Sequence, residues 1–183
     1  MSVLTLRQIG DPVLRTPASP VRDPDDGRIH HLIADMYLTM DDAQGIGLAA
    51  PQVGTGLRIF TWDVDGHRGA VINPELELSG EPVFVPRERD DDEEPVMREG
   101  CLSVRGRIHG PVARHPHALL TGIGQNGQPL HVEATGLLAA CFQHEVDHLD
   151  GKLFLDRLTG EHKKHAYRAL RNAAAPPTTA GAR

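Results

Sequence analysis

The sequence has few of the features that mark secreted, membrane or nucleic-acid-binding proteins. It has only two cysteines, Cys101 and Cys141, too few for a disulfide framework, which favours a reduced, cytoplasmic setting. No apolar run approaches the roughly 20 residues of a membrane span, and the start, MSVLTLRQIG, lacks the basic and long apolar segments of a signal peptide. The net charge of −6 does not favour nucleic acid as a main partner. We therefore expect a cytoplasmic protein with neither a membrane nor DNA as partner.

Composition and patterning in the first half predict an ordinary globular chain. Its 183 residues suit one domain, with 39% hydrophobic and 24% charged residues. Apolar residues at helical spacing predict a helix from Asp23, with Pro24 at its first helical position. Residues rich in β-branched and aromatic side chains predict strands at 57–64, 70–78 and 82–86.

The second half predicts a hairpin and two helices. Asn126-Gly127 separates two strand-like runs within residues 117–134 and predicts a type I′ turn, in which both central residues have positive φ. Helical patterning follows from about residue 134 to 149, and again from Thr159, a residue type suited to an N-cap, to about residue 175.

These elements predict an α+β fold rather than a regular alternation of strands and helices. We expect one compact domain over residues 1–175, with mostly antiparallel sheets around the helix at 134–149 and further helices near both ends, and a disordered tail at 176–183. The acidic run 87–94 predicts a solvated loop, with docking of a basic partner as the alternative. The glycine-rich run GIGLAAPQVG, residues 45–54, has too little bulk for an ordinary core strand and on its own predicts a loop.

The stretch QHEVDH, residues 143–148, contains the pattern His-Glu-x-x-His. On a helix, His144 and His148 lie on one face and can bind the same metal ion. The alternative is a chance spacing, since the chain has 11 histidines. Glu145 is too close in sequence to be an easy third ligand to the same ion, and in zinc peptidases with this pattern the glutamate is the general base.

The third ligand is predicted upstream of the motif. One class of zinc peptidase has a further histidine where this chain has Phe154, and nothing singles out the two acidic residues that follow. Upstream, EGCLSV contains Cys101, whose thiolate is a strong ligand for a borderline or soft divalent ion. Cys101, His144 and His148 would leave a fourth position open, as catalytic sites do.

Three motifs in this order, GIGLAAPQ (45–52), EGCLS (99–103) and QHEVDH (143–148), resemble the signatures of the peptide deformylases. The sequences DPVLR, INPEL and GLLAACFQHEVDHLDGKLFLDRL are also similar to that family, so the resemblance covers roughly residues 1–160. The chain departs from the family at Arg105, where proline is more common, in a long acidic segment at 80–97 and in a short last helix. None of these departures touches a predicted ligand or Glu145.

The resemblance implies an enzyme that removes the formyl group from the N-terminal formyl-methionine of new bacterial proteins and releases formate. It implies that a metal-bound water is the nucleophile, and that Glu145 takes its proton and then delivers a proton to the departing amine. It also implies that the Gln52 side-chain amide and the Leu102 backbone N–H stabilise charge on the formyl oxygen.

The resemblance further implies how the peptide binds. The substrate adds as an extra strand beside Gly45 and Gly47, which let its backbone approach closely. The methionine side chain enters a pocket, and the predicted substrate-binding residues around it are Ile46, Met97, Glu99, Gly100, Leu137, Ala140 and Cys141. A disulfide between Cys101 and Cys141 would remove a ligand, so none is expected.

The resemblance also bears on cofactor and partners. We expect one Fe²⁺ ion, with Zn²⁺, Ni²⁺ and Co²⁺ as alternatives that the ligand set permits. The expected partners are formyl-methionyl nascent peptides. Basic residues of the last helix favour a solvated helix face, with transient contact with ribosomal RNA as the alternative; these are Lys163, Lys164, Arg168 and Arg171.

Two other classes of function remain open from the sequence: a zinc endopeptidase and a metal-stabilised binding domain without activity. The upstream cysteine and the missing third peptidase ligand argue against the first class. Glu145 and Gln52 argue against the second, because neither is needed to hold a metal.

Overall fold

A computed structural model of the chain describes residues 1–85, 96–106 and 108–174. Its main sheet has five antiparallel strands in the order β1-β2-β3-β8-β9: Gly47–Ala49, Ile59–Val64, His67–Ser79, His117–Gly124 and Pro129–Thr135. Two short antiparallel pairs join β4 (Val83–Phe84) to β7 (Ala113–Arg114) and β5 (Arg98–Glu99) to β6 (Gly110–Pro111). The helices are α1 (Gly27–Asp42), α2 (Gly136–Leu149), α3 (Phe154–Arg157) and α4 (Gly160–Ala174), with 3₁₀ turns η1 (Pro12–Arg15) and η2 (Ala50–Val53).

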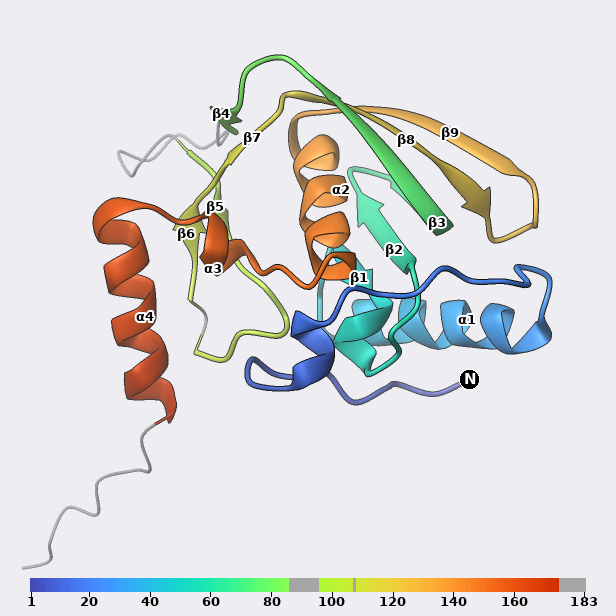
Figure 1. Cartoon of the computed structure of the whole chain (residues 1–183), viewed down its shortest axis with the longest axis horizontal. Coiled ribbons are helices and arrows are strands. Elements are labelled where there is room, and N and C mark those ends of the chain that lie inside the picture. Colours follow the sequence, from blue (N-terminus) through green and yellow to red (C-terminus); the bar gives the residue numbers. More distant parts are fainter. Residues whose placement is uncertain (86–95, 107, 175–183) are drawn as a thin grey trace, which may run out of the picture.

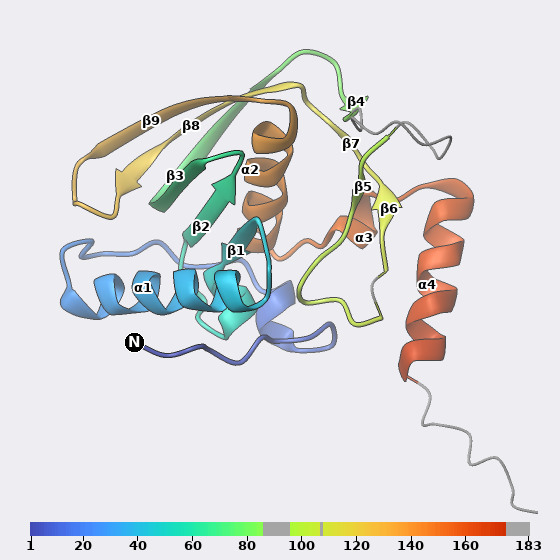
Figure 2. The same ribbon diagram turned by 180° about the vertical axis from the view of Figure 1, so that it is seen from behind.

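Helix α2 is the centre of the fold. Figures 1 and 2 show it between the five-stranded sheet and the two short strand pairs, with α1 at one end of the molecule and α4 at the opposite end. The predicted α+β fold, with mostly antiparallel sheets around a central helix and helices near both ends, is confirmed. Among the described residues, no helix is both long and apolar enough to cross a membrane.

Strand β2 is buried on both faces of the sheet, and its alternate residues point to opposite sides. On β2, Phe60 packs toward α2 and the neighbouring Ile59 packs toward α1. Phe60 and Trp62 contact Phe142 of α2, with ring centroids 5.8 and 5.1 Å apart respectively. This aromatic cluster fixes one face of α2 against the sheet and leaves another face for the functional site.

Helix α1 begins later than predicted. The sequence placed its start at Asp23 and Pro24, whereas the first helical residue is Gly27. The reason is a capping bond, since the Asp26 carboxylate accepts a hydrogen bond from the Arg28 N–H and so sets the helix start. The buried face is as the periodicity predicts, and it contains Ile29, Ile33, Met36 and Met40.

The glycine-rich run is not simply a loop. Residues Gly47–Ala49 form β1, a fully buried strand paired antiparallel with β2, and the following residues form η2. The small side chains of this strand are needed because α2 packs directly behind it. The run therefore brings Gln52 to the same cavity as its glycines.

The hairpin between β8 and β9 is present, but its turn is not type I′. Only Gly127 has a positive φ, of 75°, whereas Asn126 does not. Instead the Asn126 side chain accepts a hydrogen bond from the Gln128 N–H at 3.1 Å, which stabilises a longer loop. Helix α4 begins directly after Thr159 as predicted. The predicted acidic loop at 87–94 and tail at 176–183 lie outside the described residues.

Candidate metal centre

The three predicted ligands come together between α2 and the segment after β5. His144 and His148 lie one turn apart on α2, and Cys101 follows β5. The Cys101 Sγ is 3.1 Å from His148 Nε2. One ligand atom from each of Cys101, His144 and His148 lies within 4.8 Å of the other two. A tetrahedral metal with bonds of about 2.0–2.3 Å fits such a group.

Charge around the two histidines suits a cation. Burial holds the pKa of His148 well below its usual value, so its ring is neutral with a lone pair to offer. Burial also favours the neutral form of His144, but the Cys101 sulfur and the Glu99 carboxylate outweigh it and hold the pKa of His144 well above its usual value. The same negative groups would stabilise a bound metal ion.

Besides its contact with His148, the sulfur of Cys101 accepts from two donors. The Gln52 side-chain Nε2 lies 3.6 Å from it and the Ser103 backbone N–H lies 3.4 Å from it. Gln52 is buried, and its Oε1 accepts a hydrogen bond from the Ala49 N–H at 2.8 Å. That bond fixes the amide so that its NH₂ group points to the site.

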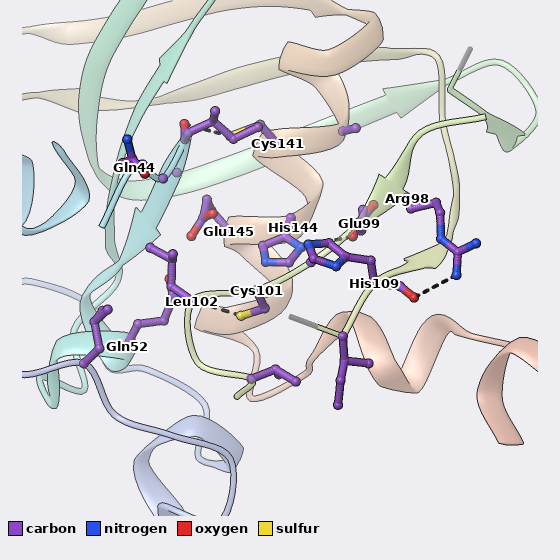
Figure 3. Close-up of a pocket in the computed structure, with 18 of the residues that line it drawn as sticks. Gln44, Gln52, Arg98, Glu99, Cys101, Leu102, His109, Cys141, His144 and Glu145 are labelled. Carbon is purple, nitrogen blue, oxygen red and sulfur yellow. Dashed lines mark hydrogen bonds and ion pairs between the residues drawn. The ribbon is translucent and has the colours of Figure 1, made fainter. Parts of the chain in front are cut away.

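Glu145 is buried beside the ligands and binds none of its neighbours strongly. Figure 3 shows its side chain between His144 and the side of the cavity that contains Gln44 and Gln52. Its Oε2 has no hydrogen-bond partner among the described residues. Burial raises the pKa of Glu145 to about 7. Such a carboxyl group can both accept and release a proton at neutral pH.

The predicted ligand His144 contacts a buried ion-pair network. Its Nδ1 is 3.0 Å from Glu99 Oε2, and the Arg114 guanidinium donates to both oxygens of Glu99 at 2.7 and 2.9 Å. Arg114 also donates to Asp147 Oδ2 at 2.7 Å. Burial alone would raise the pKa of Glu99, but Arg114 and His144 lower it to about 2, so the carboxylate stays ionised.

Sequence reasoning missed Arg114 and Asp147 and placed Glu99 only in the substrate pocket. Asp147 lies inside the quoted QHEVDH stretch, but nothing in the pattern distinguishes it from a surface residue of the helix. No motif marks Arg114. Only the combination of residues on this helix indicated a missing partner. A buried helix that contains two acidic residues and two histidines needs a cation as partner.

The site opens into a cavity of about 750 Å³. All the predicted site residues line it except His148, which is fully buried behind the others. Further lining residues were not predicted; these are Leu6, Gln8, Gln44, Arg98, Val104, Arg105, Gly106, Ile108 and His109. His109 packs so closely on Gly100 that a Cβ there would lie 2.4 Å from the ring. Cys101 and Cys141 are free thiols.

One part of the cavity is apolar. Met97, Leu137, Ala140 and Cys141 line it together, and the Cys141 thiol lies 3.5 Å from the Ile46 carbonyl oxygen, to which it donates. Burial raises the pKa of Cys141 well above its usual value, so the group stays a neutral thiol. This wall suits an unbranched apolar side chain.

A family profile, curated relatives and solved structures that resemble this chain all point to one family. The profile of the family described as polypeptide deformylase matches residues 3–164. A peptide deformylase of Acidothermus cellulolyticus is 49% identical over 173 residues, covering 94% of this chain and 88% of the relative. One from Mycolicibacterium paratuberculosis is 45% identical over 183 residues, covering 94% of this chain and 89% of the relative. The crystal structure of a Synechococcus elongatus peptide deformylase in complex with actinonin is similar with a TM-score of 0.80 and 35% identity, over 95% of this chain and 87% of that chain.

Proposed function

The chain belongs to the peptide deformylase family, metal-dependent hydrolases that remove the N-formyl group from nascent peptides, and we propose that Cys101, His144 and His148 hold its metal. The observation that carries this proposal is the convergence of their ligand atoms within 4.8 Å of one another. A divalent cation bound there would supply Lewis acidity for the attack of water on the formyl group.

Glu145 is the general base and acid of this proposal. It accepts the proton of the water that attacks the formyl carbon, and it passes a proton to the departing amine of methionine. Its buried, unpartnered Oε2 is available for this exchange. The pKa of about 7 that burial gives the group suits both directions of transfer, and a neighbouring cation favours its charged, accepting form.

Charge that develops on the formyl oxygen needs hydrogen-bond donors. The Gln52 amide serves as one, because its Oε1 is already occupied by the Ala49 N–H and its NH₂ group faces the Cys101 sulfur. The Leu102 backbone N–H serves as the second, on the segment directly after the ligand Cys101. Losing one such donor typically costs about 10²–10³ in kcat.

The substrate peptide pairs with β1. This strand is an edge of the sheet, with β2 on one side and the cavity on the other. An added strand gives backbone hydrogen bonds that do not depend on the peptide's sequence. Its methionine side chain occupies the apolar part of the cavity, which is lined by Met97, Leu137, Ala140 and Cys141. Ile46, Glu99 and Gly100 lie beside it.

We propose Fe²⁺ as the metal, with Zn²⁺, Ni²⁺ and Co²⁺ as ions that one thiolate and two imidazoles also accept. Elemental analysis of protein purified without oxygen checks this, and iron is the expected result. The cytoplasm is the compartment that fits nascent-peptide substrates. We further propose that residues 1–175 form the catalytic unit, of which residues 3–164 match the family.

The ribosome is the proposed transient partner of α4. Lys163, Lys164 and Arg168 are exposed on this helix, as is Arg171 near its end. Figure 1 shows α4 at the opposite end of the molecule from α1. A basic helix face attracts RNA phosphates, and the attraction weakens as salt rises.

A three-substrate assay tests the reaction itself. Metal-loaded protein is incubated with formyl-Met-Ala-Ser, with acetyl-Met-Ala-Ser and with an unblocked longer peptide. Formate and free Met-Ala-Ser are expected from the first substrate only, because the acetyl methyl group would meet the backbone of residues 99–103. Equal release of acetate, or internal cleavage of the long peptide, would contradict the proposal.

A further inference from the structure

Arg157, the last residue of α3, binds a carboxylate beside the metal centre. Its Nε donates to Asp147 Oδ2 at 3.0 Å and its Nη2 donates to Oδ1 at 2.5 Å, so the pair is bidentate. The Asp147 side chain is only 6% exposed, whereas that of Arg157 is 46% exposed. Asp147 directly precedes His148 in the last turn of α2. An exposed cation on a separate helix thus holds a buried anion next to a ligand.

A continuous series of hydrogen-bonded ion pairs leads from Asp147 to His144, the other proposed ligand histidine. Asp147 Oδ2 also accepts from Arg114, Arg114 binds both oxygens of Glu99, and Glu99 Oε2 contacts His144 Nδ1. Every link in this path is 3.0 Å or shorter. The path runs from the surface of α3 to the back of the His144 ring, which leaves Nε2 of that ring for a metal.

Arg157 supplies a second positive charge for the two buried carboxylates. Glu99 and Asp147 are two buried carboxylates, and Arg114, with a side chain only 4% exposed, is the buried cation between them. Without Arg157, Arg114 would have to neutralise both carboxylates, and a buried charge without a partner is strongly unfavourable. Arg114 would then move toward Asp147 and loosen its two bonds to Glu99, which orients His144.

We propose that Arg157 is a positioning residue of the metal centre, acting on His144 through Asp147, Arg114 and Glu99. The inference rests on the proposed role of His144 as a ligand. Outer partners of metal-binding histidines fix the orientation of the ring and typically change metal affinity about 10–100-fold when mutated. Arg157 stands further out, so an effect near the lower end of that range is expected.

The test compares three variants in Co²⁺-loaded protein. Arg157→Ala removes the pair, and Arg157→Lys keeps the charge but loses the bidentate fork. Arg15→Ala is the matched control. Arg15 forms a bidentate pair with Asp156, the neighbour of Arg157, and the two side chains are 42% and 36% exposed. Among the described residues no side-chain hydrogen bond joins this pair to Asp147, Arg114, Glu99 or a proposed ligand, and Arg15 acts on His148 only through its charge. The readouts are the rate of Co²⁺ loss to a chelator and the visible spectrum of the bound ion.

Arg157→Ala is expected to lose Co²⁺ about tenfold faster than the unmodified protein and to show an altered ligand-field spectrum. Arg157→Lys should recover part of the difference, and Arg15→Ala should match the unmodified protein in both readouts. An unchanged rate and spectrum in Arg157→Ala would overturn the proposal, as would an equal effect of Arg15→Ala. If Arg157→Ala does not fold, the same comparison holds for Arg157→Lys.

The same experiment separates this inference from the proposed ligand set. Cobalt bound to a thiolate gives a sulfur-to-metal charge-transfer band, which should be present in the unmodified protein and absent in Cys101→Ala. Absence of the band from the unmodified protein would contradict the ligand set, and the inference with it. A normal band together with an insensitive Arg157→Ala would contradict the inference alone.

Discussion

Glu145 is confined by residues that leave it no strong partner. Gly47 of β1 lies so close that a Cβ there would be 2.3 Å from Glu145 Oε1. The ligand His144 is its neighbour in sequence, and the Cys141 sulfur lies beside the same glycine. Burial without a hydrogen-bond partner is costly for a carboxylate. This unfavourable burial raises the pKa of Glu145 at the residue where proton transfer is proposed, and shifted pKa values are typical of functional sites.

Glu145→Gln separates metal binding from proton transfer. The amide keeps the shape of the side chain and removes its basicity. The variant is expected to retain its metal while kcat falls by about 10²–10⁴. Elemental analysis and a formate-release assay on the same sample measure both quantities. Near-normal turnover in fully metal-loaded protein would remove Glu145 from its role.

Gly47→Ala tests whether the position of Glu145 matters as much as its chemistry. The new methyl group would displace the Glu145 carboxylate and press on the Cys141 sulfur, which would lie 2.9 Å away. A displacement of about 1 Å can cost about 100-fold in rate, so kcat should fall by about 10- to 100-fold with metal content unchanged. Gly56→Ala is the control, since a Cβ at Gly56 meets nothing within 4 Å. Equal kcat in the two variants would contradict the prediction.

Local sequence signals predicted whether a segment is a helix or a strand better than they predicted where it begins and ends. The periodicity of α1, the hairpin of β8 and β9 and the patterned helix α2 all depend on neighbours in sequence, and all are present. The start of α1 was wrong because Asp26, rather than the residues before Pro24, provides the cap. The turn type was wrong because the Asn126 side chain stabilises a different loop.

The parts that could not be predicted depend on tertiary contacts. Strand β1 has the composition of a loop, and only its pairing with β2 and the closeness of α2 make it a strand. Arg114 comes from β7, far in sequence from both carboxylates that it binds. The proposed ligands and Glu145 were identified from short motifs, whereas the residues that contact and orient them had no local signal.

Helix α4 supplies a prediction of its own. Changing its four exposed basic residues to glutamine should abolish salt-sensitive co-sedimentation with ribosomes, because the electrostatic attraction to phosphates is lost; these are Lys163, Lys164, Arg168 and Arg171. The control removes four exposed basic residues elsewhere, namely Arg7, Arg22, Arg28 and Lys152, and should sediment like the unmodified protein. Failure of the unmodified protein to co-sediment at low salt would contradict ribosome contact.

Across the whole molecule, the proposed metal centre lies between two hydrophobic clusters. Helix α2, which contains His144 and His148, packs in the cluster of the five-stranded sheet through Phe142 and Leu149. Cys101 packs against a separate cluster around α3 that includes Phe154 and Leu155. A metal ion bound at these residues would therefore connect the sheet to the part of the molecule that contains α3 and α4.

Metal removal should consequently lower the melting temperature. A ligand present at 100 times its Kd adds about 2.7 kcal/mol to the free energy of unfolding, which corresponds to a shift of roughly 5–10 °C for a chain of this size. Calorimetry with and without a chelator measures the shift. Cys101→Ala should melt at the same temperature in both conditions. A similar chelator effect in that variant would mean that the stabilising metal binds elsewhere.

The central claim is that Cys101 is the third ligand, and the two cysteines of the chain allow a direct test. The measurement is the metal-to-protein ratio of the unmodified protein, Cys101→Ala and Cys141→Ala, each purified without oxygen. Cys141 lines the same cavity as a neutral thiol, but its sulfur is not in the ligand group. About one metal per chain is expected in the unmodified protein and in Cys141→Ala, and little in Cys101→Ala. Full occupancy in Cys101→Ala, or its loss in Cys141→Ala alone, would contradict the claim.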